Sequence, residues 1–455
     1  GDMDSLAWNL GDPDAPSSTN TQPSAIPFLP TATTFHPMKG PMTTQTLRGM
    51  ATHGGLHWRG DRVDGFFGLD PCDEPTGAPC DEELSFNNFI VAFEGLVGRD
   101  GILSESDMQK FTDFILDVRL PPNPVRALDR SLTASEQAGS NLYFGRTTDT
   151  VANCNGCHTL DPAQGLFGSG GEQSFEGEPQ NFKVPHLRNM VQKVGMFFSP
   201  GDQVRGFGFL HDGSVDTLKT FFESGVFSLN NAEERDLEQL MLAFDSDLAP
   251  IVGQQVTRSA ATAAGVDPRI DLLMQRCNTP FVSQVLGGQV RECDLIVKGS
   301  VGGSPRGWVQ QAGTSSFLDD ENNVIADADL RGLALSEGPL TYTAVPPGSG
   351  VRMGIDRDED SQLDGLDNCP AAPNAAGLGT CTAGEQTLLG SACTAAAQCG
   401  AEGFCSMAQE DTDGDGVGDA CEPSLVPEPG SVAMLTAGSL LLAGLGRRRL
   451  RFARA

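Results

Sequence analysis

Apolar residues recur at helical spacing through the first half of the chain. Between residues 85 and 98 they return every third or fourth position, which places them on one face of a helix. Residues 104–124 repeat this pattern behind a Ser/Glu capping signature, until two prolines stop it. Shorter amphipathic stretches follow at 133–145, 214–225 and 231–247. The pattern predicts a helix at each of these places.

The pattern changes on either side of this helical part. Residues 1–35 are rich in Pro, Ser, Thr and Asn without an apolar period, which predicts a flexible leader. Residues 251–350 carry short apolar runs between turn residues, which favours β-structure. From residue 351 the chain becomes acidic and rich in cysteine, and it ends in an apolar run followed by arginines.

Charge and cysteine content narrow the possible functions. The chain has 60 acidic and 30 basic residues and a formal net charge of −30, which argues against nucleic-acid binding. Twelve cysteines are many for a cytosolic protein, and their paired spacings predict disulfides formed in an oxidising compartment. The short spacings favour the pairs Cys72–Cys80 and Cys277–Cys293. The pairing of the last six cysteines stays open.

Residues 154–158 read CNGCH, with Cys154, Cys157 and His158 at the spacing of covalent haem c attachment. In that chemistry two thiols one turn apart add to the porphyrin vinyl groups, and the adjacent histidine binds the iron. A redox dithiol would need a βαβ context, and structural zinc would need a second Cys/His pair. The next histidine is His186 and the next cysteine is Cys277. The helical flanks therefore favour haem c, with zinc and a plain disulfide as alternatives.

The residues around this motif resemble the haem domain of bacterial di-haem cytochrome c peroxidases. The resemblance lies in GSNLYFGRTTDTVANCNGCH, FKVPHLRNMVQKVGMFF and FLHDGSVDTLKTFF, and it covers about residues 133–245. It implies a cytochrome c-type helical domain, covalent haem and a methionine as the second iron ligand.

The second iron ligand is the point where this chain departs from that family. The family's methionine immediately precedes the H-D-G turn, and Leu210 stands there in this chain. We expect Met196 to bind the iron opposite His158. Met190, His211 and an open coordination site are the alternatives.

Residues 41–61, PMTTQTLRGMATHGGLHWRGD, repeat the order of the second half of this haem domain. Two interpretations remain: a first haem motif lies upstream of Gly1, or this copy has lost its haem. No catalytic residue is assigned, but His57 is a candidate axial ligand or acid/base, and His53 is a weaker one. The structural alternative is a His–Trp pair packed against Arg59.

Two acidic stretches, GIDRDEDSQLDGLDNCP and EDTDGDGVGDACE, alternate Asp with small or polar residues. They resemble the two halves of thrombospondin type 3 calcium repeats, and their carboxylates suit a hard cation such as calcium. An EF-hand would need a bidentate Glu that is missing, and an acidic solvated linker is the other alternative. A cysteine-bearing insert, residues 371–405, separates the halves. The predicted calcium ligands are Asp356, Asp358, Asp360, Asp364, Asp367, Asp411, Asp413, Asp415 and Asp419.

The last residues, VPEPGSVAMLTAGSLLLAGLGRRRLRFARA, resemble the PEP-CTERM sorting signal of Gram-negative bacteria. The apolar stretch 431–446 is shorter than the roughly 20 residues that span a bilayer, and arginines follow it. The resemblance implies export to the periplasm or cell surface and membrane retention through the tail before its removal. A plain tail anchor is the alternative.

These observations predict a multidomain chain with mainly α cytochrome c-type haem domains, a β-leaning middle segment and a loop-rich calcium and disulfide module. The expected function is electron transfer by an exported c-type cytochrome that binds calcium, with a redox partner protein that the sequence does not identify. The alternatives are a di-haem peroxidase that reduces hydrogen peroxide and a calcium-dependent surface or adhesion protein.

The expected segments are a leader at 1–35, a truncated or degenerate cytochrome c-like domain at 36–126, the cytochrome c domain at 127–250, the middle segment at 251–350, the calcium module at 351–425 and the sorting tail at 426–455.

Overall fold

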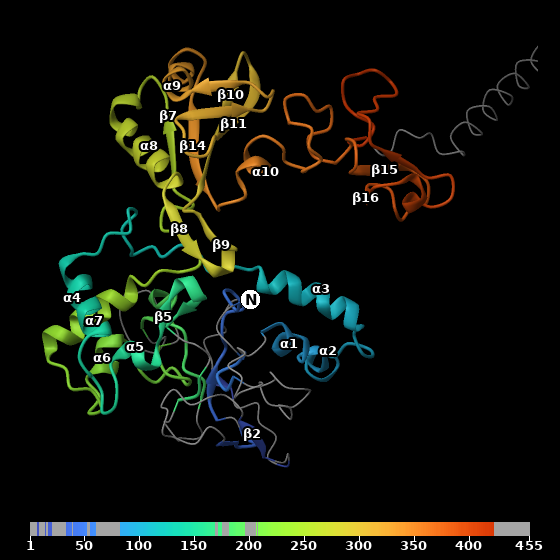
Figure 1. The fold of residues 1–455 in the computed structure, drawn as a ribbon. Coiled ribbons are helices and arrows are strands. Elements are labelled where there is room, and N and C mark those ends of the chain that lie inside the picture. Colours follow the sequence, from blue (N-terminus) through green and yellow to red (C-terminus); the bar gives the residue numbers. More distant parts are fainter. Residues whose placement is uncertain are drawn as a thin grey trace, which may run out of the picture. The chain divides into compact units, whose positions relative to one another are not determined.

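The computed structural model describes a large part of residues 7–422 (Figure 1). The ranges it leaves out within those limits are 9–13, 15–16, 21–32, 39, 52–54, 61–81, 169–171, 175–181, 196–205 and 207. The chain forms two compact units. Unit 1 comprises Gly1–Gly253 and Gln275–Cys293, and unit 2 comprises Gln254–Met274 and Asp294–Ala455.

Unit 1 combines helices with short two-stranded sheets. Its strands pair as β1 with β4, β2 with β3, β5 with β6, and β8 with β9, all antiparallel. The helices are α1 (Glu82–Asn87), α2 (Ile90–Gly95), α3 (Glu105–Leu116), α4 (Ala134–Phe144), α5 (Cys154–Cys157), α6 (Leu218–Phe222) and α7 (Asn231–Leu242). The strands are β1 (Ala7–Trp8), β2 (Ser18–Asn20), β3 (Thr33–Phe35), β4 (Met42–Thr43), β5 (Leu160–Asp161), β6 (Leu166–Phe167), β8 (Pro280–Ser283) and β9 (Gly288–Arg291).

Helices α4 and α7 pack closely and position the C-x-x-C-H motif. Each begins with a capping box, on Thr133 and on Asn230. Gly139 of α4 permits the close approach, because a Cβ there would lie 2.2 Å from the backbone oxygen of Asp236 in α7. Tyr143, at the end of α4, is fully buried and its hydroxyl donates to the backbone oxygen of His158.

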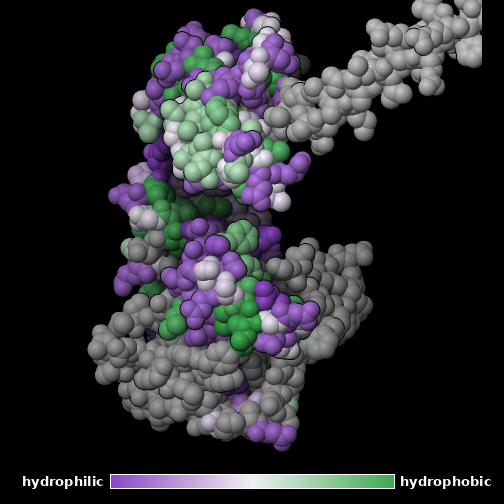
Figure 2. All heavy atoms as spheres, turned by 90° about the vertical axis from the view of Figure 1, so that its right-hand side faces the viewer, coloured by the Kyte–Doolittle hydropathy of each residue, from purple (hydrophilic) through white to green (hydrophobic). Residues whose placement is uncertain are grey.

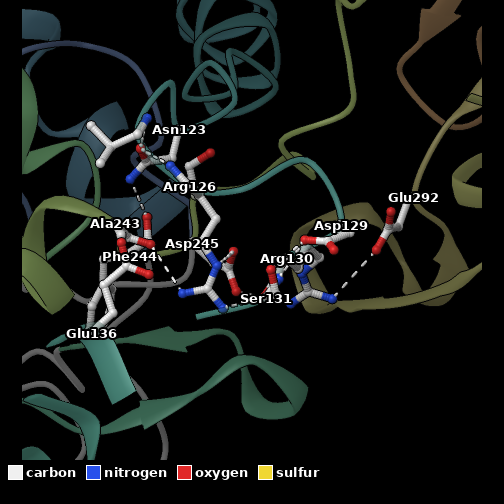
Figure 3. Close-up of polar contacts among 12 residues, drawn as sticks. Asn123, Arg126, Asp129, Arg130, Ser131, Glu136, Ala243, Phe244, Asp245 and Glu292 are labelled. Atoms are coloured by element: carbon white, nitrogen blue, oxygen red, sulfur yellow. Dashed lines mark hydrogen bonds and ion pairs between the residues drawn. The ribbon is translucent and has the colours of Figure 1, made fainter. Parts of the chain in front are cut away.

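Ion pairs, one of them fully buried, connect distant segments of unit 1. The fully buried side chains of Arg188 and Asp247 pair with each other, and Arg188 also donates to the Gly49 carbonyl oxygen at 2.8 Å. In Figure 3, Arg130 lies between Asp245, at 2.9 Å, and Glu292 of the β8–β9 segment, at 3.8 Å. These pairs hold the segments around the motif in fixed positions.

Helices α1 and α3 bury one face and expose the other. Phe86, Met108 and Ile115 belong to a buried cluster. Phe114 of α3 is 63% exposed. Figure 2, which views the side where α3 lies in Figure 1, shows hydrophobic residues among hydrophilic ones on the described surface.

Unit 2 is built on a six-stranded antiparallel sheet of order β13-β12-β11-β10-β14-β7. The cysteine-rich end of the unit adds a three-stranded sheet of order β16-β15-β17. The strands are β7 (Gln255–Arg258), β10 (Asp294–Val301), β11 (Ser304–Gln310), β12 (Ser316–Asp319), β13 (Val324–Ala326), β14 (Leu340–Val345), β15 (Gly379–Ala383), β16 (Ala392–Cys393) and β17 (Phe404–Ser406). The helices are α8 (Ala263–Cys277), whose residues 275–277 belong to unit 1, α9 (Asp327–Ser336) and α10 (Gly350–Gly354).

The predicted fold class, with mainly α cytochrome c-type domains, is wrong. The structure is 29% helical and contains several antiparallel sheets. Between α5 and α6 the described residues form loops, two-residue strands and short 3-10 turns where a mainly helical domain was expected. The physical reason is local: glycines in the left-handed region, such as Gly165 and Gly168, direct the chain into turns there.

Candidate functional site

The C-x-x-C-H motif forms one helical turn with its histidine at the C-terminal end. Asn153 caps α5 by accepting a hydrogen bond from the Gly156 amide at 2.9 Å, which starts the helix at Cys154. Residues three apart in a helix lie on the same side, so Cys154 and Cys157 are neighbours. Both are free thiols in the structure, which does not join them in the plain disulfide considered above.

The environment of the two thiols distinguishes them from a redox-active dithiol. Burial raises the pKa of both the Cys154 and the Cys157 thiol. Reactive dithiols need the opposite shift, because the thiolate is the nucleophile. The pair therefore lacks the lowered thiol pKa of a reactive dithiol.

Two backbone carbonyl groups hold the His158 ring through Nδ1, in an orientation that leaves Nε2 for a ligand. Its Nδ1 lies 2.9 Å from the Gly168 carbonyl oxygen and 3.1 Å from that of Pro185, so Nδ1 carries the hydrogen and donates. Burial lowers the pKa of His158, which favours the neutral ring. A neutral imidazole with an engaged Nδ1 is the form that binds a metal through Nε2.

These three residues line a cavity of about 520 Å³. The size falls within the range of small-molecule sites, and most of the exposed lining is apolar. Two thiols, a neutral imidazole and an apolar cavity together fit a covalently attached haem. The apolar side chains of the lining are Trp58, Phe182, Val184, Pro185, Leu187, Met190, Phe209, Leu210, Leu218, Phe221, Phe222, Val226, Phe227 and Met241.

The predicted second iron ligand, Met196, lies outside the described residues. Of the alternatives, Met190 and His211 both line the cavity. Met190 is 6% exposed, whereas the Nδ1 of His211 lies 2.7 Å from the Pro41 carbonyl oxygen and its ring stacks on Phe182. Met190 thus places a thioether at the cavity that Cys154, Cys157 and His158 line, and the choice among the alternatives stays open.

His57 lies at a second cavity of unit 1, of about 360 Å³. Its ring packs edge-on against Phe89, with the ring centroids 4.8 Å apart. Trp58 lines both cavities, donates to the Thr43 carbonyl oxygen at 2.9 Å and carries the Lys193 ammonium over its ring. The weaker candidate, His53, lies outside the described residues.

Three predicted calcium ligands of the first acidic stretch converge. Carboxylate oxygens of Asp356, Asp358 and Asp360 lie within 4.8 Å of one another. Asp356, Asp358 and Asp367 each have a buried carboxylate oxygen with no hydrogen-bond partner. Burial, together with the neighbouring Asp360, raises the pKa of Asp358 to about 6. Buried oxygens that nothing satisfies fit a calcium ion, which is bound by such groups.

Asp364, in contrast, forms ion pairs. It accepts from the Arg357 amide at 2.9 Å and lies 3.8 Å from the Lys298 ammonium. In the structure it therefore connects the acidic stretch to strand β10.

The second acidic stretch forms a similar but more exposed cluster. Asp411, Asp413 and Asp415 also have carboxylate oxygens within 4.8 Å of one another. The Gly414 and Gly416 amides donate to Asp411. Oxygen ligands of this kind suit a calcium ion. The fourth predicted ligand of this stretch, Asp419, accepts from the Thr412 amide and hydroxyl.

Among the described residues, disulfides form in unit 1 and in the cysteine-rich end of unit 2. The predicted pair Cys277–Cys293 is confirmed, and Cys72 and Cys80 lie outside the described residues. The pairing that the sequence left open is Cys369–Cys421, Cys381–Cys399 and Cys393–Cys405.

The thrombospondin type 3 repeat family matches residues 355–376 and 410–423. No curated protein and no solved structure matches the chain. The class that the site and the match define is a calcium-binding repeat module, stabilised by disulfides. The two matched segments are the two acidic stretches, and the insert lies between them.

Disulfides and thrombospondin type 3 repeats are features of secreted and extracellular proteins. In the part of the chain that the structure describes, none of the helices has the length and hydrophobicity of a membrane-spanning segment.

Proposed function

We propose that this protein is an exported c-type cytochrome that transfers electrons and is stabilised by its calcium module. The observation that carries the proposal is the placement of two free thiols, one helical turn apart, beside a neutral histidine at an apolar cavity. The calcium-binding module supports the extracellular part of the proposal.

Each residue of the site has a role in this proposal. Cys154 and Cys157 would hold the porphyrin through thioether bonds, and His158 would bind the iron through Nε2. The carbonyl groups of Gly168 and Pro185 fix the ring of His158. When bound, haem c supplies reversible one-electron oxidation and reduction. The apolar lining would exclude water and so favour the less charged oxidation state of a bound haem.

The remaining parts of this proposal concern location and partner. Residues 426–455 lie outside the described residues, and we propose that they retain the protein at the membrane of a Gram-negative bacterium until they are removed. The electrons pass to or from a redox protein outside the cytoplasm.

A di-haem peroxidase is the second candidate, and the cavity at His57 favours it. Trp58 and Lys193 line both this cavity and the haem cavity, so the two cavities are adjacent. His57 would be its candidate acid/base. This function needs a second haem, and the present sequence contains a single C-x-x-C-H.

Haem counting on the exported protein tests the first proposal. The full chain is produced in a bacterial periplasm with a cytochrome c maturation system, and covalent haem is measured by pyridine haemochrome and by haem staining of a denaturing gel. We expect one haem per chain, and none in the Cys154→Ser/Cys157→Ser variant. The matched control, Cys381→Ser/Cys399→Ser, removes two cysteines from unit 2 and keeps the haem.

The spectrum then separates the candidates. A low-spin spectrum without peroxide turnover supports the electron carrier, whereas binding of small ligands with peroxide turnover supports the peroxidase. A colourless exported protein with free Cys154 and Cys157 would overturn both and leave a calcium-dependent surface protein.

A further inference from the structure

A cluster of side-chain amides lies between the two acidic stretches of unit 2. Asn374 is fully buried, and its Nδ2 donates to Oδ1 of Asn368 at 2.7 Å. Gln409 accepts from the Asn368 amide at 2.9 Å through Oε1, and its Nε2 donates to Oδ1 of Asn374. These three residues, called here the amide cluster, are thus fully connected by hydrogen bonds.

The amide cluster is bonded to both stretches. On the first side, the Asn374 amide donates to Oδ2 of Asp360, a member of the first carboxylate cluster, at 2.7 Å. On the second side, the Gly418 amide donates to the Asn368 backbone carbonyl oxygen at 2.9 Å. The next residue, Asp419, donates through its amide to the Glu410 carbonyl oxygen, which follows Gln409.

The contact is close enough to require glycine on the second side. A Cβ on Gly418 would lie 2.3 Å from Oδ1 of Asn368 and 2.9 Å from Nδ2 of Asn374. Contacts this short are forbidden, so a side chain here would push the amide cluster apart.

The two ends of the insert lie next to each other in the structure. The Gln409 amide donates to the Asn374 carbonyl oxygen at 3.0 Å, although 35 positions separate the two residues. Strand β15 pairs with β17 just inside these ends, and both disulfides of the insert close within it. The insert therefore does not separate the two stretches in space.

We infer that the amide cluster couples the two acidic stretches into one cooperative calcium-binding unit. Calcium at the first stretch fixes Asp360 and with it Asn374, while calcium at the second fixes the segment from Gln409 to Gly418. Each event orders the same buried hydrogen bonds, so the second ion binds to a module that is already arranged. Such coupling is reciprocal between the sites. Asn368, Asn374 and Gln409 are positioning residues in this scheme.

The inference deepens the calcium-binding part of the proposed function and is independent of the haem. Its test is a calcium titration of the full chain, stripped with chelator and followed by isothermal calorimetry. We expect a Hill coefficient above one for the natural sequence. Asn374→Ala and Gly418→Ala lower the affinity about ten-fold and bring the coefficient to one, since each leaves buried polar groups unsatisfied.

Two matched controls separate coupling from general damage. Gln398→Ala removes another hydrogen-bonded amide, inside the insert, and Gly332→Ala adds a methyl group in α9 where nothing lies within 4 Å. Both keep the cooperative titration. Excision of 376–407, which removes both insert disulfides together, also keeps it and remains informative if Asn374→Ala fails to fold.

The possible results are distinct. Independent, non-cooperative binding by the natural sequence, unchanged in Asn374→Ala, overturns the coupling and leaves calcium binding intact. No calcium uptake by the natural sequence overturns the calcium function itself. Loss of cooperativity on excision of the insert would assign the coupling to the insert, against the inference.

Discussion

At the scale of single residues, the carboxyl of Asp358 links pH to the stability of the calcium module. Burial raises its pKa from 3.8 to about 6 in the folded, calcium-free protein. The folded state then binds the proton more tightly than the unfolded state. The protonated carboxyl therefore contributes stability below the unfolded pKa, and this contribution is lost as the pH rises through about 6.

The variant Asp358→Asn tests the direction of this pH dependence. In chelator, we expect the unfolding temperature of the natural module to fall between the two pKa values as the pH rises, and Asp358→Asn to show a weaker fall. Scanning calorimetry at a series of pH values measures the difference between the two proteins. An identical pH dependence would show that Asp358 is not perturbed.

Sequence reasoning can identify candidate site residues whose signal is local. Cys154, Cys157 and His158 lie within five consecutive positions, so their motif can be read without the fold. The amide cluster was missed because Asn374 and Gln409 meet only after the insert has folded back. The one available signal was that both residues flank the acidic stretches.

At the scale of elements, the contact between α4 and α7 depends on Gly139. A methyl group there would overlap the Asp236 carbonyl oxygen, so the two helices must separate. We expect Gly139→Ala to lower the free energy of unfolding of unit 1 by about 1–3 kcal/mol, the usual cost of overpacking. Urea denaturation followed by circular dichroism measures it. Gly332→Ala, with open space around it, should change stability by less than about 1 kcal/mol; equal effects of both variants would contradict the packing argument.

Helices were predictable where an amphipathic face and a cap coincide. The Ser104 cap and the apolar period of α3 agree with the structure, which begins the helix at Glu105. The period at 85–98 predicted one helix, and the structure breaks it into α1 and α2 at Asn88 and Phe89. The described residues between 158 and 217 could not be predicted in this way, because their loops follow from left-handed glycines and long-range hydrogen bonds.

At the scale of the whole molecule, the chain does not divide into consecutive blocks. Residues 275–293 belong to unit 1, although the segments before and after them belong to unit 2. The disulfide Cys277–Cys293 joins the two ends of this segment, and buried Glu292 forms an ion pair with Arg276. Hydrophobic periodicity predicts which face of an element is buried, but it does not predict which unit that face packs against. The assignment of residues 275–293 to unit 1 therefore could not be predicted from the sequence.

The first acidic stretch is part of the core of unit 2. Ile355 is buried in one cluster with Ile296 and Val309 of the six-stranded sheet, and Leu363 packs against that cluster. The Gly365 amide donates to the Asp320 carbonyl oxygen at 2.9 Å. An ion that orders this stretch must therefore stabilise the sheet as well.

Removal of calcium should consequently destabilise unit 2 and leave unit 1 unchanged. A ligand present at about 100 times its dissociation constant stabilises the folded state by about 2.7 kcal/mol, and chelation removes this amount. Hydrogen exchange measured by mass spectrometry reads the two units separately in the same full-length protein. We expect chelator to speed exchange in β10 and β11 and to leave α4 and α7 as protected as before. Equal acceleration in both units would mean that calcium stabilises the chain as one body, and no change in β10 would mean that the acidic stretch is ordered without its ion.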